Sequence, residues 1–569
     1  MATKLWSRAL AIATIAGLTF AACGQQAAPT ATAAPTGAAT ATAAPTVAAQ
    51  LGGTFRFGQS GDITVLDPWN VTDGNSLLVT RQIYESLVDY EPTGFKIVPK
   101  LATKWETSSD GKTWTFTLRD GVKFHDGTDL NAEAVVLNFE RARNTKHPQR
   151  GKPIGDEYAY WSDMWNGFDA DSVITKVEAK DPKTVVFTTK TPFGPFLANM
   201  AMPTFPIVSP KSIKDDPDGW MTVGSKGAAG TGPFVFKPGA WQKDQQITLE
   251  KNASYWDKDE KGTKLPYLDK VVFRFIKDTA ARIAELKAGS VDAIRDFSPQ
   301  DVATIKSAAN LKIIPRPSFN IAYLGVNLAK PPFDKLEVRK AVASAINKSA
   351  IVQAIFAGEA KAASQFLVPG MLGYDEPVTE FYKYDEAAAK KLLADAGFPN
   401  GFETELWYMP VSRPYYPDPK KIAEAFAADL GKIGIKAALK TEDWTPYRKD
   451  ARENKFPLWL LGWTGDNGDP DNFLNVFFHP KVVDGKDTPI EGGAWSNPTA
   501  WKLLRDAQTE SSDAKRADIY KQVSKIVQQE IPRIPMFHAN PPTGVSAKVS
   551  GFVPHPTGGE AFTRVQLSK

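Results

Sequence analysis

The sequence is poor in the residues that carry most metal and redox chemistry. Its 569 residues include one cysteine, Cys23, and five scattered histidines. An intrachain disulfide is therefore impossible, and no two histidines have the spacing of a metal-binding pair on a helix. The sequence also lacks the His-Glu-x-x-His, Gly-x-Ser-x-Gly and Walker motifs. We therefore expect no metal, no cofactor and no nucleotide hydrolysis.

The chain also lacks a strong charge of either sign. Its 68 basic and 64 acidic residues give a formal net charge of +4, which carries no signal for nucleic-acid binding. Hydrophobic content of 42% and charged content of 23% are typical of a soluble globular protein. A chain of this length exceeds one hydrophobic core, so two or three lobes are expected. Fifteen Trp and 32 Phe suit either large cores or an aromatic-lined cleft.

Long hydrophobic runs are absent except near the N-terminus. The apolar run Leu10–Phe20 follows a short basic segment and is too short to span a bilayer. Residues 18–23 resemble a bacterial lipobox, which implies removal of a signal peptide, residues 1–22, and lipidation of Cys23. The alternative is an ordinary signal peptide followed by an incidental cysteine.

Residues 23–50 consist almost entirely of Ala, Thr and Pro, and Ala-Ala-Pro-Thr occurs three times. This segment has nothing with which to form a core, so we expect a disordered tether with a reach of roughly 30 Å. Acyl chains such as palmitate on Cys23 would then hold an exported protein at the outer face of the cytoplasmic membrane.

The remaining chain changes pattern along its length. Residues 113–118 alternate with period two, which predicts a strand with Trp114, Phe116 and Leu118 on one face. Asn131 is placed to cap the helix that follows. Beyond residue 280, amphipathic helices alternate with strands, as in an α/β lobe. One long helix is predicted over 336–357, ending at Gly358.

An ordered set of motifs resembles the signature of the peptide/nickel family of solute-binding proteins. The motifs are residues 101–106, 110–119, 121–127, 230–234 and 338–348. The resemblance implies a non-enzymatic extracytoplasmic binding protein of an ABC importer, acting as a monomer with membrane permease subunits as partners. It also implies the class II periplasmic-binding-protein fold, in which two α/β lobes flank a cleft. His125, within the third motif, is expected to be structural.

The same resemblance divides the folded part of the chain. Lobe I is expected from 51–84, 230–317 and 537–569. An extra domain, 85–229, is inserted into it, and lobe II is expected from 318–536.

Two further segments, 406–415 and 462–473, resemble the ligand-binding segments of the family's dipeptide-binding members. The resemblance implies that Arg413 binds the peptide carboxylate and Asp466 the α-ammonium, with Trp463 and Tyr415 beside them in the cleft. By pattern alone, Asp466 is a turn former and Arg413 a structural residue.

The chemistry of a dipeptide is consistent with this assignment. Its end charges are about 7 Å apart in an extended chain. The planar guanidinium of Arg donates two parallel hydrogen bonds to a carboxylate, and Asp accepts from an ammonium. The loop residues Asn75 and Ser76 are further candidates, because the family's corresponding loop faces the cleft.

Alternatives remain open at this point. An oligosaccharide would need stacking aromatic faces and neutral polar partners, and a nickel chelate would need converging ligands. A glycoside hydrolase would need a second carboxylate near Asp466. Calcium is disfavoured because Gly468 and Pro470 interrupt the expected spacing of oxygen ligands.

Overall fold

The computed structural model describes residues 51–150, 158–216, 221–222, 227–375, 382–489 and 494–568. Cys23 and the predicted signal peptide and tether lie outside these residues. The described chain belongs to one compact unit, Ala48–Lys569.

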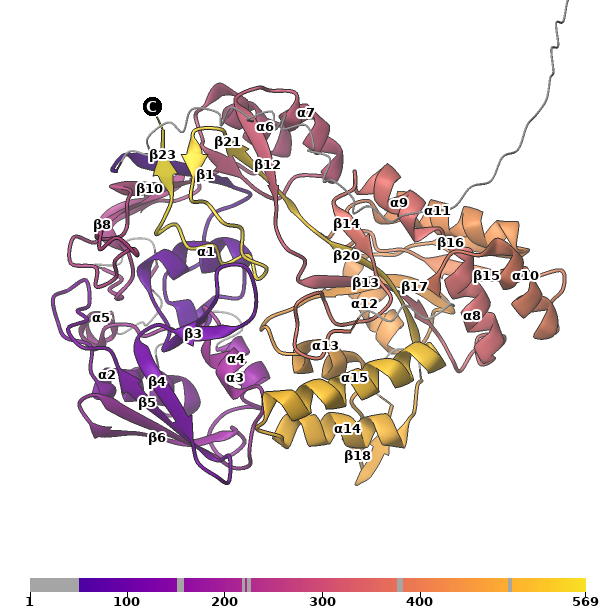
Figure 1. Ribbon diagram of the computed structural model, residues 1–569, viewed down its shortest axis with the longest axis horizontal. Coiled ribbons are helices and arrows are strands. Elements are labelled where there is room, and N and C mark those ends of the chain that lie inside the picture. Colours follow the sequence, from indigo (N-terminus) through magenta and orange to yellow (C-terminus); the bar gives the residue numbers. More distant parts are fainter. Residues whose placement is uncertain are drawn as a thin grey trace, which may run out of the picture. The chain divides into compact units, whose positions relative to one another are not determined.

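Three sheets organise this unit (Figure 1). The first has the order β12-β21-β11-β1-β10-β9-β8 and consists of β1 (Thr54–Gln59), β8 (Phe234–Gln242), β9 (Gln246–Lys251), β10 (Lys270–Phe275), β11 (Ala293–Ile294), β12 (Leu311–Pro315) and β21 (Pro542–Ser546). The second has the order β14-β20-β13-β17-β15-β16 and consists of β13 (Asn320–Val326), β14 (Ala360–Ala362), β15 (Phe402–Trp407), β16 (Ile435–Lys440), β17 (Leu458–Thr464) and β20 (Arg533–Ala539). The third has the order β4-β5-β7-β6 and consists of β4 (Ala102–Thr107), β5 (Thr113–Leu118), β6 (Ile174–Asp181) and β7 (Thr184–Thr189).

Short strand pairs and helices complete the architecture. The pairs are β2 (Val88–Tyr90) with β3 (Ile97–Pro99), β18 (Lys481–Val483) with β19 (Lys486–Thr488), and β22 (Val549–Ser550) with β23 (Gln566–Leu567). The helices are α1 (Gly74–Ile83), α2 (Ala132–Arg143), α3 (Ala159–Met164), α4 (Phe196–Met200), α5 (Pro210–Asp215), α6 (Thr279–Ala288), α7 (Val302–Lys306), α8 (Leu336–Ala345), α9 (Lys348–Ile355), α10 (Glu386–Asp395), α11 (Pro419–Lys432), α12 (Trp444–Arg452), α13 (Asp471–Phe478), α14 (Pro498–Thr509) and α15 (Asp513–Glu530), with 3-10 turns η1 (Pro68–Asn70) and η2 (Pro299–Asp301). Within the described ranges, no helix is both long and apolar enough to cross a bilayer.

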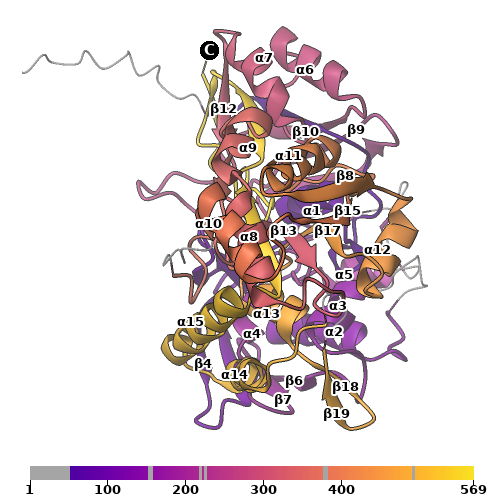
Figure 2. The ribbon, with the colours of Figure 1, turned by 90° about the vertical axis from the view of Figure 1, so that its right-hand side faces the viewer.

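The second sheet is buried on both faces. Every residue of β13 is buried, and alternate side chains enter different cores. Leu324 packs with α8, α9 and α11, whereas Tyr323 packs with α13 and α15. Figure 2 shows the two groups of helices around this sheet. The sheet is therefore a rigid platform for the loops at its edges.

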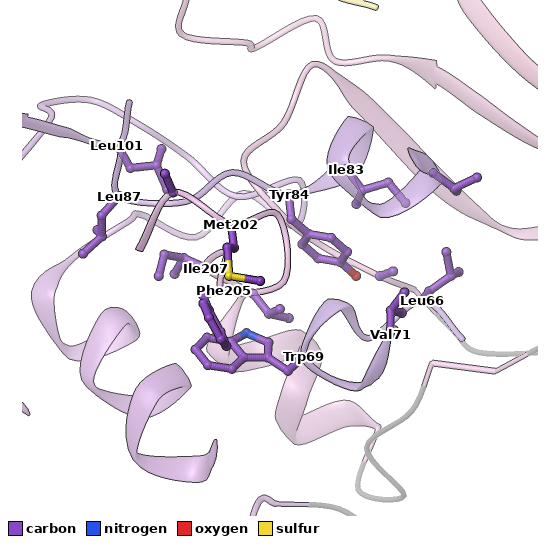
Figure 3. Close-up of a cluster of buried hydrophobic side chains, with 14 of the residues drawn as sticks. Leu66, Trp69, Val71, Ile83, Tyr84, Leu87, Leu101, Met202, Phe205 and Ile207 are labelled. Atoms are coloured by element: carbon purple, nitrogen blue, oxygen red, sulfur yellow. The ribbon is translucent and has the colours of Figure 1, made fainter. Parts of the chain in front are cut away.

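The first and third sheets share one hydrophobic core. Buried residues of β1 and β10 belong to the same cluster as those of β5. Figure 3 shows part of this cluster, where Trp69 lies beside Phe205, with ring centroids 5.3 Å apart. The predicted alternation in β5 is confirmed, because Trp114, Phe116 and Leu118 are buried. The Asn131 cap of α2 is also confirmed, since its Oδ1 accepts the N–H of Ala134 at 2.9 Å.

His125 joins two of the sequence motifs. Its Nδ1 accepts the N–H of Gly230 at 3.4 Å, and its Nε2 donates to the carbonyl of Gly232 at 2.9 Å. Burial lowers the pKa of His125 to about 4, so the ring is neutral at pH 7. This arrangement supports the structural role expected for His125.

Two connections, residues 316–319 and 540–541, run between the first and second sheets. The N–H of Arg316 donates to the carbonyl of Pro541 at 3.0 Å, so the two connections lie side by side. The predicted fold class, two α/β lobes joined by crossing strands, is confirmed. Strands of each sheet come from the ranges expected for one domain, although β20 continues three residues beyond the boundary drawn at residue 536. The division into three domains remains our proposal.

The prediction of one helix over 336–357 is wrong. The segment forms α8 and α9, which are separated at Ile346 and Asn347. The side chain of Asn347 accepts the N–H of Ala350 at 3.0 Å and caps α9. A strong N-cap inside an apolar repeat therefore starts a new helix.

Candidate functional site

Two loops leave the second sheet at the same edge. The strand β17 is parallel to β15 at Leu406 and Trp407. The carboxyl ends of parallel strands meet at one edge of a sheet, which is where ligands bind in open α/β folds. The segment that follows β15 carries Arg413, and the segment that follows β17 carries Asp466.

A cavity of about 520 Å³ lies at this edge. Its volume is that of a small-molecule site. It contains four of the residues predicted from the sequence, Arg413, Tyr415, Trp463 and Asp466. The other lining residues are Tyr323, Trp444, Arg448, Ala451, Arg452, Trp459, Leu461, Gly462, Thr464, Val476, Phe477 and Arg533.

Asp466 is a half-buried carboxylate held by polar neighbours. Its Oδ1 accepts from the Tyr160 hydroxyl at 3.2 Å, and its Oδ2 accepts from the Asn472 amide at 3.3 Å. The backbone N–H of Asp466 donates to Asn472 Oδ1 at 2.8 Å. Burial raises the pKa of Asp466, and the two hydrogen bonds oppose that rise. An ammonium group placed here would supply the cation that favours the charged carboxylate.

Arg413 is presented by a tight turn. Its backbone exchanges two hydrogen bonds with Tyr416, at 3.0 and 2.9 Å, and the Tyr416 hydroxyl donates to the carbonyl of Tyr323 at 3.0 Å. The guanidinium itself is exposed, with its central carbon 5.2 Å from the centre of the Trp444 ring. The backbone is thus fixed to the sheet while the cation stays available to a ligand.

Tyr415 needs a glycine opposite it. A Cβ at Gly462 would come within 2.4 Å of the Tyr415 ring and 2.6 Å of the carbonyl of Ile321. Tyr415 is buried, and its hydroxyl accepts a hydrogen bond from Arg413. The absence of a side chain at Gly462 therefore brings the turn that carries Arg413 against β17.

Arg533 lies beneath the cavity among aromatic rings. Its guanidinium carbon is 5.0 Å from the ring centre of Tyr323 and 5.4 Å from that of Phe477. Desolvation lowers the pKa of Arg533, and Tyr323 partly offsets this through its hydrogen bond. Arg533 is therefore part of the cavity floor.

Asn75 and Ser76 are not brought to this cavity. The Ser76 side chain is fully buried, and its Oγ accepts the N–H of Thr64 at 2.9 Å. The Asn75 amide lies between Ser60 and Arg295, near the first sheet. A ligand role for these two residues remains a prediction without support from the cavity.

Sequence reasoning missed Tyr160, Trp444, Arg448, Arg452 and Arg533. Tyr160 precedes Asp466 by 306 residues and approaches it from the segment that contains the third sheet. Two more bonds join this segment to the same loop, from Asn467 to Asn199 at 2.5 Å and from the N–H of Gly468 to the Tyr90 hydroxyl at 3.1 Å. No local pattern in the sequence signals these long-range contacts.

A second cavity of about 310 Å³ lies beside the two connections and shares Arg413. It lacks Asp466, and its two carboxylates, Asp296 and Glu359, lie outside both predicted ligand-binding segments. The larger cavity, which unites the two predicted charged residues, is the better candidate site.

Comparisons with known proteins find similar sequences and similar structures over most of this chain. The family described as bacterial extracellular solute-binding proteins, family 5, in its middle part, matches residues 96–485. Di/tripeptide-binding protein 1 of Pseudomonas aeruginosa is 35% identical over 522 residues, which cover 90% of this chain and 94% of that protein. HbpA2 of Haemophilus parasuis is 33% identical with a TM-score of 0.81, covering 91% of this chain and 100% of that one. An ABC transporter-associated periplasmic binding protein of Helicobacter pylori, in complex with the peptide STSA, is 29% identical with a TM-score of 0.69, covering 91% and 99%.

Proposed function

Because the chain belongs to family 5 of the bacterial extracellular solute-binding proteins, we propose that it binds di- or oligopeptides in an interlobe cleft and delivers them to an ABC permease. Members of this family are substrate-binding components of ABC importers and not enzymes, which confirms the expectation that the chain is not an enzyme. Closure of the lobes around the ligand is the change that a permease would recognise.

The observation that carries the peptide assignment is that Arg413 and Asp466 line the same cavity. An arginine and a carboxylate are complementary to the two ends of a zwitterion. Among the described residues that line the cavity, Asp466 is the one carboxylate, so a hydrolytic carboxylate pair has no second member there. The arginine-rich lining also disfavours a neutral oligosaccharide.

Dipeptides and tripeptides should raise the melting temperature, whereas disaccharides should not. A peptide at 100 times its dissociation constant stabilises the folded state by about 2.7 kcal/mol if it binds only that state. Thermal melts with a peptide panel and with cellobiose measure this effect. A large shift with cellobiose and none with any peptide would replace the peptide assignment with the sugar alternative.

Lipid anchoring at Cys23 completes the proposal, and it rests on the lipobox-like residues 18–23. The change Cys23→Ser should move the protein from the membrane fraction to the soluble fraction, because the thioether cannot form. Fractionation and mass spectrometry of the N-terminus measure this. A wild-type protein that is fully soluble and begins at another residue would exclude the anchor.

A further inference from the structure

The candidate cavity holds more positive charge than a simple dipeptide requires. Four arginines line it, Arg413, Arg448, Arg452 and Arg533, against the single carboxylate of Asp466. A dipeptide with neutral side chains brings one ammonium and one carboxylate, which occupy Asp466 and Arg413 in the proposed function. Arg533 lies among the aromatic rings of the floor. Arg448 of α12 therefore remains to be explained.

Arg448 lines the same cavity as Arg413 and shares an aromatic neighbour with it. The ring of Trp444 is close to both cations, with its centre 5.2 Å from the guanidinium carbon of Arg413 and 5.8 Å from that of Arg448. The Arg448 side chain is exposed. Among the described residues, no carboxylate lies within ion-pair distance of Arg448, so its charge is available to a ligand bound beside Arg413.

The positive charge continues beyond the cavity. An adjoining cavity of about 560 Å³ shares Arg448 and Arg452 and is otherwise lined by Thr445, Lys449, Glu453 and Lys481. Arg448 and Arg452 are four residues apart on α12, so their side chains lie on one face of the helix. Arg448 and Arg452 therefore form a positively charged boundary between the two cavities.

We infer that Arg448, with Arg452 beside it, forms a subsite for an acidic side chain on the C-terminal residue of the bound peptide. This inference rests on the proposed function, because it takes the peptide carboxylate to be at Arg413. The side chain of that residue starts one bond from the atom that carries the carboxylate. A Glu or Asp side chain thus brings a second anion to the neighbouring guanidinium, where charge-assisted hydrogen bonds form. The protein selects peptides that end in an acidic residue.

Calorimetry with Ala-Glu and Ala-Gln tests the subsite, because these ligands have the same shape and differ in one charge. Wild-type protein should bind Ala-Glu at least about tenfold more tightly, a difference of about 1.4 kcal/mol. In Arg448→Gln this ratio should fall to about threefold or less. Lys243→Gln, which removes an exposed charge from the turn between β8 and β9, should keep the wild-type ratio.

The outcomes separate this inference from the function on which it rests. If wild type binds both dipeptides equally, the acidic subsite is excluded while peptide binding stands. If neither dipeptide binds, the acidic subsite is excluded, and if no member of the peptide panel used in the thermal melts binds either, the proposed function is excluded as well. Glutarate is the third ligand, because it carries two carboxylates and no ammonium. If it binds as tightly as Ala-Glu, the arginines form a dicarboxylate site and not a peptide side-chain subsite.

Discussion

Replacing Asp466 with alanine should weaken the binding of a free dipeptide by at least about 30-fold. In the proposed complex this carboxylate is the partner of the ligand ammonium. Removal of one member of a desolvated charge pair costs about 2–5 kcal/mol, because the other charge stays buried and unpaired. The lower figure corresponds to about 30-fold in the dissociation constant. Isothermal titration calorimetry measures this loss directly.

Modified ligands make the test specific. N-acetylation removes the ammonium, so wild type should bind an N-acetyl dipeptide poorly, and C-terminal amidation should weaken the interaction with Arg413 in the same way. Asp466→Asn should lose most of the preference for the free amine. Asp518→Ala, an exposed position on α15, is the matched control and should bind like wild type. Equal affinity of wild type for free and end-blocked peptides would contradict both assigned roles.

Replacing Arg516 with methionine should lower the free energy of unfolding by about 3–5 kcal/mol. Arg516 donates to both oxygens of Asp469, at 2.8 and 2.6 Å, and both side chains are almost fully buried. Methionine fills much of the same space and leaves Asp469 as a buried anion without its cation. Urea denaturation gives the free energy of unfolding of each variant and measures the loss.

A matched control separates the burial of this ion pair from the loss of an arginine. Arg505 lies on the neighbouring helix α14 and forms an exposed ion pair with Asp487 of β19. The change Arg505→Met should therefore alter the free energy of unfolding by less than about 1 kcal/mol. The double change Asp469→Asn with Arg516→Met should recover part of the stability, because no charge remains buried. Equal effects of the two single arginine changes would contradict this account.

The sequence predicted the elements whose signals are local. The alternation around Trp114 and the Asn131 cap each depend on neighbours within a few residues, and both are present. The wrong prediction of one helix over 336–357 also follows from a local signal. The apolar period of this segment is continuous, although the cap at Asn347 starts a second helix. Periodicity predicts a helical face, but capping residues decide where one helix ends and the next begins.

The site was only partly predictable. The resemblance predicts Arg413 and Asp466 as ligand-binding residues, and the parallel pairing of β15 and β17 accounts for their lining the same cavity. The role of Tyr160 could not be predicted from the sequence, because its contact with Asp466 depends on how the segment containing the third sheet packs against the second sheet. Arg448 was likewise hidden, since a lone Arg on an amphipathic helix is usually a solvated surface residue.

The parallel pairing of β15 and β17 has a consequence for ligand length. In the proposed clamp, both ends of the peptide are held by loops of one sheet, whose strand spacing is fixed by backbone hydrogen bonds. The second sheet then fixes the distance between the positions that bind the ammonium and the carboxylate. This distance does not depend on the angle between the two lobes. Opening and closing would govern capture and release, while the preferred number of residues would change only through insertions or deletions in the two loops.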